Sequence, residues 1–234
     1  MSFGVLFIGL FFMLVGWIVS SRLKGKFRKY SETHLTRDLT GGEIARLMLA
    51  DNGIHDVQVI SVEGQLTDHY NPANKTVNLS QEVYHGRNAA AAAVASHECG
   101  HAVQHAKSYS MLQLRSAMVP IQSISAKVLN IMVMIMIFGG FAARGLFSGD
   151  AALLVIIACY GVFTLFALIT LPVEFDASRR ALAWIEQRGI VNTREHEMAK
   201  DALKWAAMTY VVAALAALTT LFYYVMLFLG GRDR

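Results

Sequence analysis

The sequence of 234 residues has few charged residues, only three prolines and only two cysteines. Soluble domains carry about a quarter charged residues, whereas this chain has 16% and is 55% apolar. Two cysteines exclude a disulfide scaffold, and since Cys159 lies in an apolar run and Cys99 does not, no bridge between them is expected. The low proline content excludes collagenous and proline-rich disordered chains. The remaining charges lie in blocks between long apolar runs, which is typical of a membrane protein.

Four apolar runs are each close to the length of about 20 residues that crosses the hydrocarbon core. The first run is followed, not preceded, by a cluster of Lys and Arg residues, so a retained anchor is favoured over a cleaved signal peptide. The four expected spans are residues 3–20, 128–147, 151–171 and 208–230.

The two middle runs are separated only by residues 148–150, which predicts an antiparallel hairpin. Gly139 and Gly140 would allow its helices to approach closely. Asn130 and Arg144 shorten the uncharged part of the first of these runs, so a re-entrant hairpin stays open as an alternative.

The basic residues predict the orientation of the chain in the membrane. Residues 21–127 hold 12 of the 21 Lys and Arg residues, and residues 172–207 hold 6. The positive-inside rule therefore places both polar blocks in the cytoplasm. We interpret the net charge of +4 in the same way, so no nucleic acid partner is expected.

The first polar block carries signals for a small α+β domain. Thr40 and Glu43 form a capping-box pattern, and the helix that they open should end near Gly53. Pro72 lies in a turn typical of a hairpin. Three short runs rich in β-forming residues predict a small β-meander, at 57–62, 65–70 and 76–79.

Further helices are indicated by composition and period. The Ala-rich run 89–95 after Asn88 predicts a buried helix with a slim surface. Residues 111–128 show apolar positions three or four apart, and packing over the domain is favoured there over lying in the membrane surface. Pro172 suits the start of a helix, and residues 192–195 resemble a second cap.

His97, Glu98 and His101 form an H-E-x-x-H pattern within the Ala-rich helix. Residues four apart share a helix face, so both imidazoles can bind one Zn²⁺ while Glu98 reaches a water on the metal. A buried Ala-rich helix has little other reason to carry these polar side chains.

A catalytic zinc usually takes three protein ligands, so a third must come from elsewhere. The metzincin pattern fails because Gln104 and Lys107 replace its Gly and His. His105 lies about 12 Å along the helix axis from His97, too far to bind the same ion, so we expect it to be a surface or outer residue. Glu174 could complete two His and one Glu, or it could be a charged cap at the membrane surface.

Four segments resemble the YugP-like family of neutral zinc membrane peptidases, and the similarity covers nearly the whole chain. More distantly, the arrangement is similar to the HtpX membrane proteases. The segments are Leu-Thr-Asp-His-Tyr-Asn-Pro at 66–72, Lys-Thr-Val-Asn-Leu-Ser at 75–80, the histidine-rich run 97–105 and Leu-Pro-Val-Glu-Phe-Asp-Ala-Ser at 171–178.

The resemblance implies that His97 and His101 bind zinc, that Glu98 acts in catalysis and that Glu174 is the third ligand. The more distantly similar HtpX proteases usually carry Asp or Asn four residues after the ligand Glu, and here Ser178 stands in that place. Which residue orients the ligands is therefore open.

The expected function is zinc-assisted hydrolysis of peptide bonds, in unfolded or membrane-associated proteins at the cytoplasmic face of a bacterial inner (plasma) membrane. Glu98 would act as general base and then as general acid. The hairpin 65–79 could accept an extended substrate as an added strand. Protein or peptide substrate and membrane lipid are the expected partners, and the sequence leaves open whether the chain forms a homo-oligomer.

The alternative function is a zinc-binding membrane scaffold without turnover, although a structural zinc normally has four ligands and no need for Glu98. An intramembrane protease is disfavoured because the residues after the motif are too polar for lipid. The fold expected is a mainly α, multi-pass membrane protein with about four transmembrane helices and a cytoplasmic α+β zincin-like domain. Its divisions are an N-terminal anchor (1–20), the zincin-like domain (21–127), a transmembrane hairpin (128–171), cytoplasmic helices with the third ligand (172–207) and a C-terminal transmembrane helix (208–230).

Overall fold

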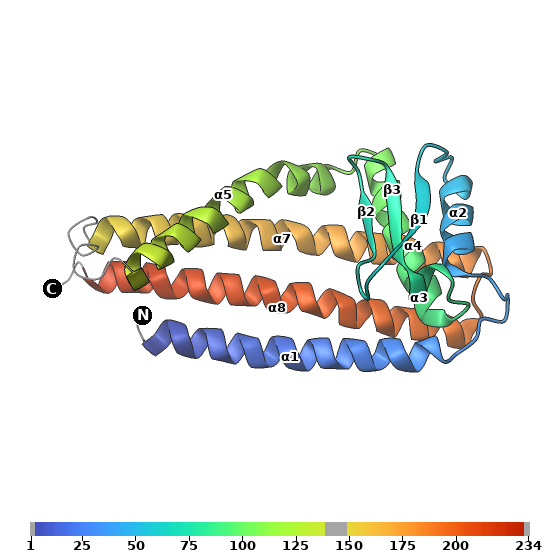
Figure 1. The fold of residues 1–234 in the computed structure, drawn as a ribbon, viewed down its shortest axis with the longest axis horizontal. Coiled ribbons are helices and arrows are strands. Elements are labelled where there is room, and N and C mark those ends of the chain that lie inside the picture. The colour runs from blue at the N-terminus through green and yellow to red at the C-terminus, as the bar shows by residue number, and fades with distance from the viewer. Residues whose placement is uncertain (1–2, 139–148, 232–234) are drawn as a thin grey trace. The chain divides into compact units, whose positions relative to one another are not determined.

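The computed structural model describes residues 3–138 and 149–231 (Figure 1). The chain divides into two compact units. The first, here called the apolar unit, contains the described parts of Met1–Trp17, Leu114–Thr170 and Tyr210–Arg234, and the second, called the α+β unit, contains Ile18–Gln113 and Leu171–Thr209. The elements in chain order are α1 (Phe3–Ser31), α2 (Gly41–Asp51), β1 (Gln58–Val62), β2 (His69–Asn71), β3 (Thr76–Ser80), α3 (Gln81–Tyr84), α4 (Ala89–Ala106), α5 (Ser110–Phe138), α7 (Gly149–Gln187) and α8 (Thr193–Gly231).

The apolar unit consists of helical segments with bare apolar surfaces. Phe7, Trp17, Ile124 and Phe222 are each 61% or more exposed, which is unfavourable in water and suited to lipid. Four helices are long and apolar enough to cross a membrane, namely α1, α5, α7 and α8. This agrees with the predicted count of about four spans. The predicted hairpin loop at Ser148, together with Gly139, Gly140 and Arg144, lies outside the described residues.

The helices are longer than the sequence pattern indicated. The amphipathic run 111–128 and the described start of the next expected span form one helix, α5. Pro172 does not begin a helix, because α7 runs through it as a single helix of 39 residues. Such a helix is about 58 Å long and exceeds the hydrocarbon thickness of about 30 Å. Val173 and Ala177, just after the proline, are fully buried, so tertiary packing outweighs the local cost of the proline.

The predicted β-meander is wrong. The strand order is β1-β3-β2, with β1 parallel and β2 antiparallel to β3 (Figure 1). All five residues of β3 are buried, whereas β1 and β2 are partly exposed, so the most buried strand takes the centre. The link from β1 carries Gly64 and Leu66 with positive φ, and Ser80 N–H donates to the Asp68 carboxylate at 2.8 Å. This link brings β2 to the far edge of β3.

Helix α4 lies at the centre of the α+β unit. On one side Ala95, Cys99 and Ala102 pack in a core with α2 and β3, and on the other side Ala92 and Ala93 pack with α7 and α8. Small side chains allow both sides to be covered, as the alanine run predicted. Asn88 caps the helix by accepting from Ala91 N–H.

Both predicted capping boxes are present. Thr40 accepts from Glu43 N–H while Glu43 accepts from Thr40 N–H, and the helix they open, α2, ends just before Gly53, whose φ is +68°. Asn192 and Glu195 form the same reciprocal pair at the start of α8. Cys99 and Cys159 are free thiols, as expected.

Candidate metal centre

Helix α4 presents two imidazoles to the same place. His97 and His101 lie one turn apart, and their ring centroids are 4.8 Å apart. His101 is 7% exposed, and Glu98, which follows His97, is 9% exposed. The helical spacing therefore places two nitrogen donors and a carboxylate in a largely dry region.

Helix α7 adds a carboxylate to this pair. Glu174 Oε2 lies 3.2 Å from His97 Nε2 and 3.6 Å from His101 Nε2, and Glu174 is 3% exposed. One ligand atom from each of the three residues lies within 4.8 Å of the others. Ligands of a tetrahedral zinc at about 2.0–2.1 Å are about 3.3 Å from one another. The three side chains therefore fit one zinc ion, and the surface-cap alternative for Glu174 does not describe its buried position.

The approach of α4 to α7 depends on a glycine. A Cβ atom at Gly100 would lie 2.6 Å from the carbonyl oxygen of Ala177, closer than real contacts allow. Gly100 lies between the two histidines in the sequence, and Ala177 lies one turn after Glu174. The close contact of the two backbones at this point allows the ligands on the two helices to meet.

In each imidazole Nε2 faces Glu174, and Nδ1 contacts a polar side chain. Ser178 Oγ lies 3.1 Å from His97 Nδ1, and Gln104 Oε1 lies 3.0 Å from His101 Nδ1. Such partners fix ring orientation and leave Nε2 to face a metal. Ser178, whose role the sequence left open, thus contacts one of the candidate ligand histidines.

Gln104 has the more complete set of contacts. Its Nε2 donates to Val173 O at 2.8 Å and to Asp176 Oδ2 at 2.9 Å, and Gln104 is fully buried. Because both of these atoms only accept, the amide oxygen must face His101. That oxygen cannot donate, so His101 carries its proton on Nδ1, and in the neutral ring Nε2 keeps its lone pair.

Asp176 links this network to two arginines. Its carboxylate accepts from Arg179 at 2.8 Å and from Arg180 at 2.6 Å. The hydrogen bonds from Gln104 and from both arginines offset burial and hold the pKa of Asp176 below its ordinary value. Sequence reasoning missed Gln104 and Asp176 as members of the candidate site. Gln104 was considered only as a position where the metzincin pattern fails. Its place on α4, three residues after His101 and so on the same helix face, was the signal that could have identified it.

Glu98 contacts the edge of the sheet. The backbone N–H of Tyr70 in β2 donates to Glu98 Oε2 at 3.0 Å. This donor turns one carboxylate oxygen toward β2 and leaves the other oxygen for a proton. His105 is exposed and lies apart from the three ligand candidates, with its Nδ1 2.7 Å from the Tyr70 hydroxyl, consistent with an outer position.

Two of the three ligand candidates, Glu174 and His101, have shifted pKa values. Burial would raise the pKa of Glu174, but hydrogen bonds from His101 and His97 hold it well below its ordinary value. Burial would lower the pKa of His101, but the hydrogen bond to Glu174 and the charge of Glu98 hold it above its ordinary value. The cluster thus retains a proton that a metal ion would have to displace.

Cys99, although inside the motif, has no part in this cluster. It is fully buried, its thiol donates to the carbonyl oxygen of Ala45 in α2, and burial raises its pKa. The thiol is therefore a core group and not a fourth ligand.

Comparison with known proteins identifies the family of the chain. A family described as "Putative neutral zinc metallopeptidase" matches residues 5–229. The chain is also 41% identical over 213 residues to "Putative membrane protease YugP" of Bacillus subtilis (strain 168), which covers 91% of each chain. No solved structure matches the chain significantly. The resemblance inferred from the motifs is confirmed, and the chain belongs to the family of putative neutral zinc metallopeptidases.

Proposed function

We propose that this protein is a membrane-bound zinc endopeptidase that cuts unfolded or membrane-associated proteins at the cytoplasmic face of a bacterial inner membrane. The observation that carries the proposal is the convergence of His97, His101 and Glu174 beside Glu98. Three protein ligands leave a position for water or substrate, as in catalytic zinc sites, whereas a structural site is closed by four. Family membership supports the same activity.

Glu98 is the proton carrier in this proposal. Zinc, when bound, supplies a Lewis acid that polarises the scissile carbonyl and acidifies a water molecule. Glu98 takes the proton of that water and later donates it to the leaving amine. The Tyr70 N–H holds one carboxylate oxygen at 3.0 Å, which restricts the rotation of the side chain and directs the other oxygen to the proton.

Strand β2 is the proposed binding surface for substrate. In the described sheet β2 pairs only with β3, so its other edge has no strand partner. Tyr70 N–H points from that edge to Glu98, so an extended peptide added along β2 would pass the general base. Recognition of this kind reads main chain more than side chain, and we expect loose sequence specificity for unfolded segments.

The cytoplasmic orientation rests on the distribution of Lys and Arg, most of which lie in residues 21–127 and 172–207. Those ranges include all of the candidate site. Cytoplasmic ends of membrane proteins and unfolded cytoplasmic segments would then be accessible substrates.

The test compares wild type with Glu98→Gln, both purified in detergent as full-length chains, for cleavage of a reduced and alkylated protein. Glu197→Gln, on an exposed part of α8, is the matched control. We expect wild type and the control to cut, and Glu98→Gln to keep its zinc but lose at least a hundredfold in rate. If wild type binds zinc and cuts neither soluble unfolded nor membrane substrates, the zinc-binding scaffold is the better function; if wild type binds no zinc, the ligand set is wrong.

A further inference from the structure

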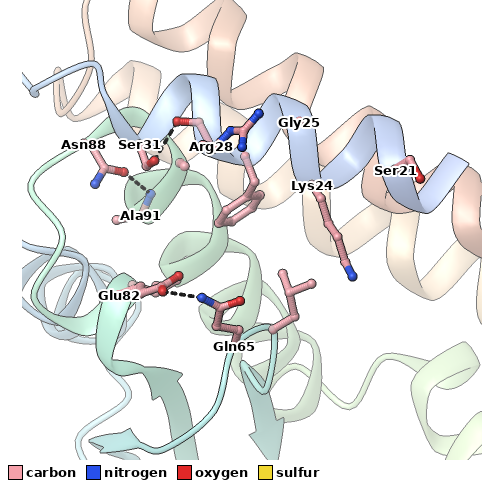
Figure 2. A pocket seen from close by; sticks show the side chains of 13 residues that line it. Ser21, Lys24, Gly25, Arg28, Ser31, Gln65, Glu82, Asn88 and Ala91 are labelled. Atoms are coloured by element: carbon pink, nitrogen blue, oxygen red, sulfur yellow. Dashed lines mark hydrogen bonds between the residues drawn. The ribbon is translucent and has the colours of Figure 1, made fainter.

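The α+β unit contains a pocket that shares no lining residue with the candidate metal centre. It has a volume of about 820 Å³ and lies between α1, the link before β2 and the start of α4 (Figure 2). Pockets for small molecules and cofactors commonly measure about 300–1,000 Å³. The pocket is therefore large enough for a ligand of that class.

One wall carries two basic side chains of α1. Lys24 and Arg28 lie one turn apart on α1, and neither forms an ion pair within the described residues. Lys26, on another face of the same turn, is different, since its Nζ lies 2.7 Å from Asp201. Side chains four apart on a helix can reach one common ligand. Lys24 and Arg28 therefore offer a site for an anion.

The opposite wall is polar in one part and apolar in another. Figure 2 shows Gln65 and Glu82 across the pocket from α1, and Gln65 Nε2 donates to Glu82 at 2.7 Å. Leu66 and Val83 add apolar surface to this wall, and Leu66 is 52% exposed, while Phe27 adds apolar surface to the wall formed by α1. Two free cations face one carboxylate that already accepts a hydrogen bond, so the balance favours an anion that also carries apolar groups.

Gly25 widens the pocket between the two cations. Its φ is not positive, and a Cβ atom there would meet nothing within 4 Å, so neither conformation nor packing requires glycine. Glycine inside a helix is unfavourable relative to alanine. Gly25 therefore leaves open space next to Lys24.

The position along α1 indicates the source of the ligand. The uncharged part of α1 ends at Ser21, so Lys24 lies about 5 Å and Arg28 about 10 Å further along the axis. The polar zone of a bilayer is about 5–7 Å thick on each side of the hydrocarbon. With the apolar part of α1 in the membrane, Lys24 lies at the depth of lipid headgroups.

We propose that this pocket binds the headgroup of an anionic phospholipid, with the phosphate between Lys24 and Arg28 and the glyceride against Leu66 and Phe27. Hydroxyl groups of such a headgroup can donate to Glu82 and accept from Gln65 in place of their mutual bond. This site does not depend on the proposed peptidase activity, because none of its residues belongs to the metal centre.

The test is a lipid titration of the full-length protein in mild detergent, followed by native mass spectrometry. The probes are phosphatidylglycerol, phosphatidylcholine and soluble glycerol 3-phosphate, at equal ionic strength. The variant is Lys24→Ala/Arg28→Ala, and the matched control is Arg22→Ala/Lys29→Ala, which removes the same charge from the same segment outside the pocket. Gly25→Phe, which fills the open space, is a second variant.

We expect wild type and the control to bind one phosphatidylglycerol in preference to phosphatidylcholine. The Lys24→Ala/Arg28→Ala variant should bind about 30-fold more weakly, from about fivefold for each basic residue near a membrane. Gly25→Phe should weaken binding while keeping both cations. Equal losses in the variant and the control, equal binding of both lipids, or binding of glycerol 3-phosphate without phosphatidylglycerol would each overturn the proposal. Circular dichroism and zinc content show whether each variant is folded.

Discussion

The buried amide of Gln104 forms three hydrogen bonds at the candidate metal centre, to His101, Val173 O and Asp176. In Gln104→Leu, which has a similar volume, all three are lost. Two neutral bonds contribute about 1 kcal/mol each and the bond to a carboxylate about 1.5–3 kcal/mol. In this variant Asp176 still accepts hydrogen bonds from both arginines, which reduces the free-energy cost of losing its bond from Gln104. We therefore expect the unfolding free energy of the metal-free protein to fall by about 3–4 kcal/mol.

The same substitution should weaken zinc binding, because His101 loses the partner that fixes its ring. Losing such a partner typically costs 10- to 100-fold in metal affinity. Gln104→Glu separates the two effects. Its carboxylate can still accept from His101 Nδ1, which preserves zinc binding, but it cannot donate to Val173 O and would repel Asp176, so stability should still fall.

The assay is chelator competition for zinc affinity together with urea unfolding in detergent for stability. Gln113→Leu is the matched control, since Gln113 is an exposed residue of α5. The reasoning is refuted if Gln104→Leu binds zinc as tightly as Gln113→Leu does. It is also refuted if Gln104→Glu loses zinc affinity as fully as Gln104→Leu.

Three other predictions concern packing, pH and orientation. Gly100→Val should push α4 away from α7, lower the free energy of unfolding by about 1–3 kcal/mol and weaken zinc binding. The control Gly25→Ala, whose Cβ would lie in open space, should leave zinc binding unchanged. Unaltered zinc affinity in Gly100→Val would contradict the packing argument. Because Glu174 raises the pKa of His101, protons should begin to compete with zinc for this residue at a pH above 6.5. Zinc affinity measured between pH 5.5 and 8 should therefore rise with pH, and a flat profile would count against the assigned ligands. A cysteine introduced by Glu197→Cys should react with a membrane-impermeant maleimide in inverted vesicles only, and labelling of intact cells would reverse the predicted orientation.

The local elements of this protein were predictable from its sequence because their causes are local. Apolar runs of membrane-spanning length, two capping boxes and the alanine run each act over a few residues, and the structure contains all of these elements. The spacing of His97 and His101 puts both rings on one face of α4 whatever surrounds the helix. The motif, its helix and the membrane character of the chain thus follow from sequence alone.

The sheet order and the continuity of α7 were not predictable in this way. A meander is the simplest path for three short strands, but β3 is the strand that the core buries completely, and it lies between the other two. Pro172 is a reasonable helix start when judged alone, yet the residues after it are buried against α4, and the helix continues. In both cases long-range burial outweighed a local preference.

Only the tertiary structure decided how the candidate metal centre is completed. Glu174 lies 77 residues from His97 in the chain, and no period links them; they meet because Gly100 allows α4 to touch the backbone of α7. Ser178 is an ordinary residue in the sequence and becomes a partner of His97 only when the two helices are in contact. Gln104 is on the same helix as His101, but its amide is oriented by Val173 O and Asp176 of α7. Local sequence determines which groups a helix carries, whereas the packing of small residues between helices determines which of those groups meet.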